Sequence, residues 1–142
     1  MQDCIFCQIL QGRAEASIVY AEEKVTAFMD IQPVNLGHVL VIPNAHAAYL
    51  ADLEQDTGAH LFRVAMEVSQ AVRGAGVRCE GVNLFLADGE VAGQEVFHVH
   101  LHVFPRFKGD GFGLKFGPSY AVRPPRETLN KIAERIKAAL RR

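Results

Sequence analysis

The sequence has no apolar run approaching the roughly 18 residues that a transmembrane helix needs. Its first residues, Met1 to Cys4, lack the charged and apolar regions of a secretory signal peptide. We therefore expect a protein that does not enter a membrane and that stays in the cytoplasm.

Cysteine is also scarce, with three residues among 142. An odd number argues against a disulfide framework and fits a reducing compartment, where a Cys-x-x-Cys pair more often serves metal or redox chemistry. Cys4 and Cys7 form such a pair, but one pair supplies only half of a tetrahedral zinc shell. A zinc knuckle, a redox dithiol and two small buried side chains are all compatible with the pair by itself.

No long block of like charge is present, and the formal net charge is -1. The only basic cluster is the pair Arg141-Arg142. Because duplex nucleic acid is held through basic patches, we expect no partner of that kind.

What the chain does contain is enough apolar material for one core, since 49% of its residues are hydrophobic. We expect one domain over residues 1–142. The apolar periodicities predict a helical turn, two hairpin strands, an apolar strand, a long helix, two further strands and a last helix. These elements are expected at 4–10, 17–20, 25–29, 38–43, 53–74, 81–87, 97–106 and from 127 onward, with a glycine-rich loop at 108–113.

The most informative stretch is Phe97-His98-Val99-His100-Leu101-His102-Val103-Phe104. Its alternation has a period of two, so a β-strand would present the three imidazoles on one face and apolar residues on the other. Residues on the same face lie about 6.7 Å apart, and the row could therefore grip a phosphate ester. A half-buried strand with surface histidines is the alternative. Three of the six histidines in register favour a site.

A loop rich in glycine, residues 88–94, precedes this strand. Gly89 and Gly93 allow backbone N–H groups to approach phosphate oxygens closely, and Gln94 adds a side-chain amide. We expect an anion clamp here, although a plain hairpin loop fits the same residues.

The histidine run matches the His-φ-His-φ-His-φ-φ pattern (φ is apolar) of the histidine triad (HIT) nucleotide hydrolases and transferases. Segments 4–9, 27–33, 37–43 and 92–96 resemble other segments of that family, in the family's order. The resemblance covers a core of about 3–107, whereas the extension 108–142 resembles that of bacterial members only loosely.

The resemblance implies an α+β fold with a five-stranded antiparallel sheet, one long helix and a C-terminal helix. It also implies a homodimer in which the two sheets join. His100 is the implied nucleophile toward a nucleotide α-phosphorus, giving a nucleotidyl-histidine that water resolves. His102 is expected to bind a phosphate oxygen and assist the leaving group, Gln94 and nearby backbone amides to offset phosphoryl charge, and His38 and His98 to complete the active site.

The implied activity is hydrolysis of purine nucleoside phosphoramidates or diadenosine polyphosphates. A nucleotidyltransferase and a non-catalytic nucleotide- or metal-binding module, with the triad itself holding a metal, are the alternatives. The nucleoside is expected beside Ile5, Phe6, Ile9, Phe28, Ile31 and Leu40, with Asp30 on the ribose and Gly93, Gln94, Glu95 and Val96 near the phosphate. Without the resemblance, the six apolar residues would be assigned to the core and Asp30 to a turn.

Some relatives bind zinc through the residues that correspond to Cys4, Cys7, His46 and His98. Two thiolates and two imidazoles form a closed, structural shell, so the resemblance implies a structural zinc ion. With zinc bound, His98 is a ligand and not an acid.

Two positions depart from the family pattern. Ala87, next to Asp88, stands where many members have Asn or Gln, which implies a missing phosphate contact. Glu95 stands where Ser or Thr is common, and a carboxylate there could repel a polyphosphate or protonate an amine. The leaving group therefore stays open.

Overall fold

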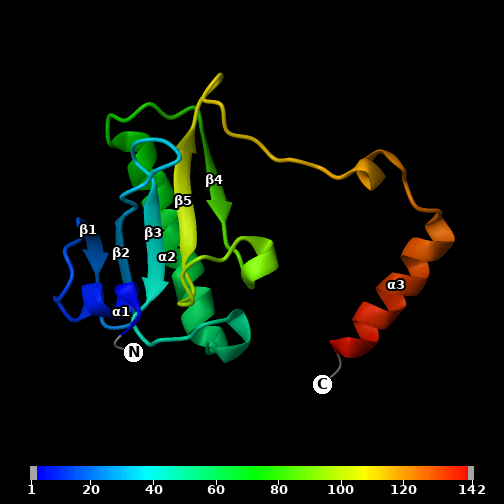
Figure 1. The fold of residues 1–142 in the computed structure, drawn as a ribbon, viewed down its shortest axis with the longest axis horizontal. Coiled ribbons are helices and arrows are strands. Elements are labelled where there is room, and N and C mark those ends of the chain that lie inside the picture. Colours follow the sequence, from blue (N-terminus) through cyan, green and yellow to red (C-terminus); the bar gives the residue numbers. More distant parts are fainter. Residues whose placement is uncertain (1–2, 141–142) are drawn as a thin grey trace. The chain divides into compact units, whose positions relative to one another are not determined.

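The structure, a computed structural model, describes residues 3–140. It comprises two compact units, one ending at Gly111 and the other beginning at Phe112, and each is described by itself (Figure 1). Within the described residues, no helix has the length and apolar character required to cross a membrane.

The first unit is built on a single five-stranded antiparallel sheet with the strand order β1-β2-β3-β5-β4. This confirms the expected α+β fold with five strands. In chain order the helices and strands are α1 (Ile5–Leu10), β1 (Ile18–Ala21), β2 (Val25–Met29), β3 (Val39–Pro43), α2 (Gln55–Gly74), β4 (Gly81–Phe85) and β5 (Leu101–Arg106). Short 3-10 turns lie at Leu50–Asp52 and Glu90–Ala92.

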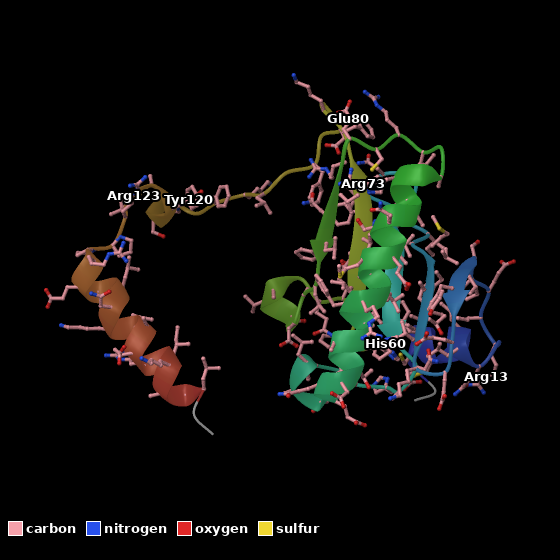
Figure 2. The ribbon with its side chains drawn as sticks, turned by 180° about the vertical axis from the view of Figure 1, so that it is seen from behind. Arg13, His60, Arg73, Glu80, Tyr120 and Arg123 are labelled. Atoms are coloured by element: carbon pink, nitrogen blue, oxygen red, sulfur yellow. The ribbon has the colours of Figure 1, made fainter. Side chains whose placement is uncertain are left out.

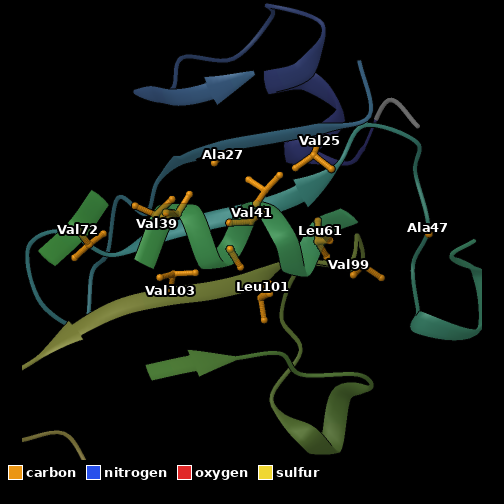
Figure 3. Packing of buried hydrophobic residues seen from close by; sticks show 13 residues of the cluster. Val25, Ala27, Val39, Val41, Ala47, Leu61, Val72, Val99, Leu101 and Val103 are labelled. Atoms are coloured by element: carbon orange, nitrogen blue, oxygen red, sulfur yellow. The ribbon is translucent and has the colours of Figure 1, made fainter. Parts of the chain in front are cut away.

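One face of the sheet is covered by α2 (Figures 1 and 2). Alternate residues of β3 and β5 point to this face, where they meet the apolar stripe of the helix. The long helix was predicted from that stripe. The main core consists of Val25, Ala27, Val39, Val41, Ala47, Leu61, Val64, Ala65, Val68, Val72, Val99, Leu101 and Val103 (Figure 3).

The β1–β2 hairpin is tied to α2 by polar contacts. The Glu22 carboxylate accepts the Tyr20 hydroxyl at 2.5 Å and pairs with Nε2 of His60, which Figure 2 labels on α2. His60 thus has a structural partner in this unit.

The opposite face of the sheet carries a smaller apolar cluster and the candidate site. Phe6 from α1 packs there with Phe28, Leu40 and Ile42, the residues of β2 and β3 that point away from α2. Leu40 lies opposite His102 in the β3–β5 ladder. The ladder therefore places an imidazole directly beside this cluster.

The histidine strand is shorter than predicted, because β5 begins at Leu101 and not at Phe97. The ladder between β3 and β5 ends at the pair Val41–Leu101. Pro43, two residues further along β3, has no N–H to donate, and the N–H of Val99 donates to the Ala47 carbonyl at 2.8 Å. His98 and His100 thus lie just before the strand, with His98 in a bend.

The second unit contains a 3-10 turn at Pro118–Ala121 and the helix α3, Arg126–Ala139. Phe116 stacks on Tyr120 with ring centroids 3.9 Å apart. The predicted last helix is confirmed to within a residue at its start. All of its side chains that the structure describes are exposed.

Candidate functional site

The site is a row of imidazoles on the sheet face opposite α2. His100 and His102 come from β5 and the residue before it, and His38 from the residue before β3. The ring centroids of His100 and His102 are 4.9 Å apart, and those of His38 and His102 are 5.2 Å apart. His38 and His100 are buried, whereas His102 is half-buried.

His100 has a fixed tautomer. Its Nδ1 lies 2.7 Å from the backbone carbonyl of His98, and since a carbonyl only accepts, Nδ1 carries the hydrogen. The lone pair is therefore on Nε2. The ring of Phe6 meets His100 edge-on at 5.1 Å. Burial lowers the pKa of His100, against the opposing influence of the His98 carbonyl and the nearby carboxylates, so the ring is neutral at pH 7.

A second chain of hydrogen bonds fixes His102. The N–H of Val34 donates to Nδ1 of His38 at 3.0 Å, which places the His38 hydrogen on Nε2. That nitrogen donates to Nδ1 of His102 at 2.9 Å, and so His102 carries its hydrogen on Nε2. Burial, followed by the neighbouring His100 and His38, lowers the pKa of His102 to about 4.

Asp30, the residue after β2, lies beside His38 at one end of this series of hydrogen bonds. Its Oδ1 accepts the N–H of Gln32 at 2.8 Å, and its Oδ2 lies 3.5 Å from Nε2 of His38. The carboxylate is thus both a turn residue and a neighbour of the imidazole row. It could accept further hydrogen bonds from a ligand hydroxyl, because an ionised carboxylate has about four acceptor positions.

The second cluster at the site is formed by Cys4, Cys7, His46 and His98, whose ligand atoms all lie within 4.8 Å of one another. Cys4 is the N-cap of α1, and its Sγ accepts the Cys7 N–H at 3.4 Å. The Nδ1 of His98 lies 3.4 Å from Cys4 Sγ, 3.7 Å from Cys7 Sγ and 3.2 Å from His46 Nδ1. Cys7 Sγ lies 3.3 Å from His46 Nδ1.

These distances fit a tetrahedral metal ion. Zinc bond lengths give tetrahedral edges of about 3.3 Å between two nitrogens and about 3.5 Å between nitrogen and sulfur. The Nε2 of His98 donates to the Pro43 carbonyl at 2.8 Å, which leaves the lone pair of Nδ1 directed at the cluster. Two thiols and two imidazole lone pairs therefore converge on one point.

A third group, Asp30, His38 and His102, also brings ligand atoms within 4.8 Å. Its hydrogen-bond pattern argues against a metal ion, because Nε2 of His38 already carries a hydrogen while Nδ1 accepts from Val34. Nor do His98, His100 and His102 form a common ligand group in the described residues, since Nδ1 of His100 is engaged by a carbonyl. The geometry therefore opposes the alternative in which the triad itself holds a metal.

The apolar residues expected around a nucleoside separate into two sets. Phe6, Phe28 and Leu40 are buried in one cluster, and Ile9 and Val96 pack against it. Ile31 is 96% exposed and does not join them, because it follows β2 in the turn begun by Asp30. Ile5 is exposed on α1 and lines a cavity of about 450 Å³ together with Asp3, Cys4, His46, Glu95, Val96 and Phe97.

Gln94 holds its loop together. The side chain is buried, its Oε1 accepts the Gly89 N–H at 2.8 Å, and its Nε2 donates to the carbonyls of Ala48 and Val96 at 2.7 and 3.1 Å. All of its polar groups are therefore engaged by backbone, in contrast to the expected phosphate contact. Gly93 has a φ of 102°, a conformation that favours glycine.

The two departures from the family pattern have distinct surroundings. Ala87 is buried, and the neighbouring Asp88 accepts the Leu50 N–H at 3.0 Å. Glu95 is exposed, and its charge raises the pKa of His100 against the effect of burial. Sequence reasoning missed the Pro43 and His98 carbonyls and the Val34 N–H, because backbone groups have no residue-type signal.

The sheet and its histidine row define an α+β protein with an imidazole-based site beside a buried apolar cluster. The HIT domain family model matches residues 11–109. An uncharacterised HIT-like protein of Borreliella burgdorferi is 42% identical over 118 residues, covering 82% of this chain and 85% of that one. The adenosine 5′-monophosphoramidase of Schizosaccharomyces pombe is 32% identical over 139 residues, covering 97% and 98%.

Solved structures agree. A HIT family protein of Bacillus anthracis has a TM-score of 0.88 at 39% identity, with 96% of each chain covered. A Zn-bound histidine triad family protein of Mycobacterium smegmatis has a TM-score of 0.76 at 35% identity, covering 98% of this chain and 96% of that one. The chain belongs to the HIT family.

Proposed function

We propose that the protein hydrolyses nucleotide α-phosphate bonds through a nucleotidyl-histidine on His100. The observation that carries the proposal is the 2.7 Å hydrogen bond from Nδ1 of His100 to the His98 carbonyl. It leaves a neutral imidazole with its lone pair on Nε2, the form that acts as a nucleophile at neutral pH.

In the first step, the Nε2 lone pair forms a bond to the α-phosphorus while the bond from phosphorus to the leaving nitrogen or oxygen breaks. The electron pair of the broken bond goes to the leaving group: a nitrogen takes up a proton from solvent water and leaves as the amine, and an oxygen leaves as the phosphate anion. The His100 ring gains positive charge, which the His98 carbonyl stabilises through Nδ1–H. In the second step, a water oxygen bonds to phosphorus, and the electron pair of the Nε2–P bond returns to His100. The proton lost by the water leaves with the nucleoside monophosphate or passes to solvent.

His102 and His38 support this chemistry. His102 carries its hydrogen on Nε2 because its Nδ1 accepts from His38. It is therefore proposed to donate to a phosphoryl oxygen and to stabilise charge on the leaving group. Gln94 is proposed to act through its loop, by fixing the backbone at Gly89 and Val96 beside the phosphate, together with Gly93 and Glu95.

The nucleoside is proposed to lie on Phe6, Phe28, Ile9 and Leu40, with Ile5 and Ile31 at the exposed margin and Asp30 on the ribose. Purine nucleoside phosphoramidates and diadenosine polyphosphates are the proposed substrates. The similarity to the Schizosaccharomyces pombe adenosine 5′-monophosphoramidase supports the phosphoramidates.

A structural zinc ion is proposed at Cys4, Cys7, His46 and His98. The convergent ligand atoms and the Zn-bound relative of Mycobacterium smegmatis support it. When bound, the ion would tie α1 to the sheet and occupy Nδ1 of His98, so that His98 would act only as a ligand and as the carbonyl acceptor for His100.

A cytoplasmic homodimer is proposed as the working form. β4 is an edge strand, and its residues Asn83, Leu84 and Phe85 are exposed. An unpaired strand edge presents free N–H and C=O groups, and pairing of two β4 strands would continue the sheet across the dimer.

The test is hydrolysis of adenosine 5′-phosphoramidate and of diadenosine tetraphosphate by the wild type and by His100→Ala. We expect the variant to lose at least about 10⁴-fold in rate, and intact-mass analysis of quenched wild-type reactions to find one added nucleotidyl group. Equal rates for both proteins would overturn the proposed hydrolase activity and favour a non-catalytic binding module. Transfer of the adenylyl group to an added alcohol in preference to water would favour a nucleotidyltransferase.

A further inference from the structure

An exposed aromatic side chain lies beside the imidazole row and has no part in the chemistry proposed above. Phe85 is the last residue of β4, and its partner in the β4–β5 ladder is His102. The ring centroids of the two residues are 5.6 Å apart, with an angle of 58° between the ring planes. Phe85 is nevertheless 43% exposed, so a ligand that reaches His102 can also contact the ring of Phe85.

Phe85 lies across β5 from the buried apolar cluster. Directly paired residues of neighbouring strands share a face of the sheet, and Phe85 is therefore on the face that carries His102. The strand order β2-β3-β5-β4 places Phe28 and Leu40 on one side of the histidine strand and Phe85 on the other. A nucleotide whose base lies over β2 and β3 and whose α-phosphorus lies over β5 can thus direct its leaving group toward β4. Because His102 is proposed to stabilise that leaving group, Phe85 would border it.

The charges close to the reacting ring do not suit a polyphosphate leaving group. Residues 79–105 contain no Lys or Arg. Burial lowers the pKa of His100, whereas the carboxylates of Asp30 and Glu95 raise it, and the charged side chains that act on this ring are therefore both negative. A chain of phosphates would be repelled here, in contrast to an amine, which leaves without negative charge.

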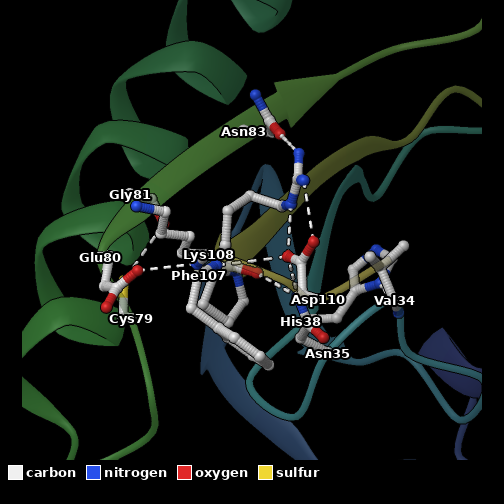
Figure 4. Close-up of polar contacts among 12 residues, drawn as sticks. Val34, Asn35, His38, Cys79, Glu80, Gly81, Asn83, Phe107, Lys108 and Asp110 are labelled. Atoms are coloured by element: carbon white, nitrogen blue, oxygen red, sulfur yellow. Dashed lines mark hydrogen bonds and ion pairs between the residues drawn. The ribbon is translucent and has the colours of Figure 1, made fainter. Parts of the chain in front are cut away.

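The cation at the end of β5 does not change this balance. Arg106 lies four residues beyond His102, which is about 13 Å along the strand. Its guanidinium donates to the Asp110 carboxylate at 2.6 and 2.9 Å and to Oδ1 of Asn83 at 2.7 Å (Figure 4). The positive charge is thus distant from the reacting phosphorus and is compensated by a carboxylate.

The proposed pairing of two β4 strands leaves Phe85 accessible. Main-chain N–H and C=O groups pair in the plane of a sheet, whereas side chains stand roughly perpendicular to that plane. A second copy at the edge of β4 would therefore use the backbone of the strand and not this face of the ring.

We propose that Phe85 is a specificity-determining residue that selects phosphoramidates whose leaving amine carries an aromatic ring. The inference rests on the proposed hydrolysis and names its substrate class. A leaving nitrogen within hydrogen-bond reach of His102, about 3 Å, needs a spacer of only one or two carbons to bring its ring against Phe85. Aromatic pairs prefer offset or edge-to-face arrangements with centroids about 4.5–7 Å apart. The bond changes are those given above: the P–N bond breaks, and the aromatic amine leaves with a proton from solvent water.

The test compares two adenosine 5′-phosphoramidates, one made with 2-phenylethylamine and one with n-propylamine. For the wild type, we expect kcat/KM to be about three- to tenfold higher for the phenylethyl compound. Phe85→Leu keeps an apolar side chain but removes the ring, and it should bring this ratio close to one, mainly through KM. The matched control Phe62→Leu alters an exposed aromatic residue of α2, on the other side of the sheet, and should keep the ratio of the wild type.

Two kinetic results would overturn the proposal. The first is the same ratio in the wild type and in Phe85→Leu. The second is an equal fall in kcat/KM for both compounds in Phe85→Leu, because the ring would then act by positioning His102 and not by contacting the leaving group.

Binding separates this proposal from the proposed chemistry. In calorimetric titrations of His100→Ala, the phenylethyl compound should bind about three- to tenfold more tightly than the propyl compound, and His100→Ala/Phe85→Leu should lose the difference. Equal affinities of His100→Ala for both compounds would count against the aromatic contact. A wild type that hydrolyses neither compound, with a binding preference that depends on Phe85, would overturn the hydrolysis alone.

Discussion

The metal cluster offers the sharpest prediction, through removal of one ligand. Cys7 is 6% exposed, and its Sγ lies 3.3 Å from Nδ1 of His46 and 3.7 Å from Nδ1 of His98. Cys7→Ser replaces a thiolate by a hydroxyl that binds zinc poorly. Cys79→Ser is the matched control, because Cys79 Sγ donates to the Gly81 carbonyl away from the cluster.

The expected loss of stability follows from linkage. A metal present at about a thousandfold excess over its dissociation constant stabilises the folded state by about 4 kcal/mol. In a chain of this size, each kcal/mol moves the Tm by roughly 3 °C, so loss of the ion should lower the Tm by roughly 10 °C. Only six residues form α1, too few to stay helical alone, and Phe6 should then leave the ring of His100.

Differential scanning calorimetry with and without chelator measures this, together with the zinc content of the purified protein. Wild type and Cys79→Ser should each hold about one zinc per chain and should lose stability with chelator, whereas Cys7→Ser should resemble the chelated wild type. With the substrate assay in hand, kcat should fall more than KM rises, because the loss loosens the His98 carbonyl that orients His100. A wild-type protein without zinc, and with the same Tm in chelator, would refute the reasoning.

Three further perturbations test other parts of the site. Gln94→Ala removes the hydrogen bonds that its side chain makes to the Gly89 N–H and to the Ala48 and Val96 carbonyls, so the free energy of unfolding in urea should fall by about 1–3 kcal/mol. An unchanged midpoint would contradict a role for Gln94 in holding the loop. The pKa of His102 is lowered to about 4, so the unfolded chain takes up protons first as pH falls below about 6.5, and folded stability should decline by about 1–2 kcal/mol toward pH 4. His102→Gln should flatten that dependence in urea titrations, and an identical slope would count against it. Asp110→Ala should cost about 1–3 kcal/mol in the same assay, because Arg106 loses its hydrogen bonds to this carboxylate and Asn35 loses one of its two acceptors; full stability would contradict a stabilising role for Asp110.

Periodicity was sufficient to predict most of the fold. The stripe of α2 and the alternation in the apolar strands arise from burial of one face, which leaves a trace in a single sequence. Within α2, Ala71 lies at the helical spacing of the buried residues but is exposed, in contrast to the prediction from that spacing. The organisation of residues 1–142 as one domain stays a prediction.

The site was less accessible to such reasoning. That Cys4, Cys7, His46 and His98 lie together could be expected only from the family resemblance, because they come from three separated segments. The spacing of residues gives no indication of which backbone group will accept a hydrogen bond, and so the engagement of Gln94 and the early end of the histidine strand at Pro43 required the structure. The exposure of Ile31 likewise depends on the path of a turn.

The proline at the end of β3 has a consequence for which substitutions the site can tolerate. Pro43 has no amide hydrogen, and the β3–β5 ladder ends at the pair Val41–Leu101, next to the reactive imidazole of His100. Beyond the end of the ladder, backbone carbonyls can accept hydrogen bonds from side chains. The Pro43 carbonyl accepts from the ring of His98, and the His98 carbonyl accepts from the ring of His100, so both rings are oriented. Pro43→Val would supply the missing N–H and could extend the β3–β5 ladder by one hydrogen bond. The ring of His100 would then lose its orientation, although the fold as a whole would stay stable.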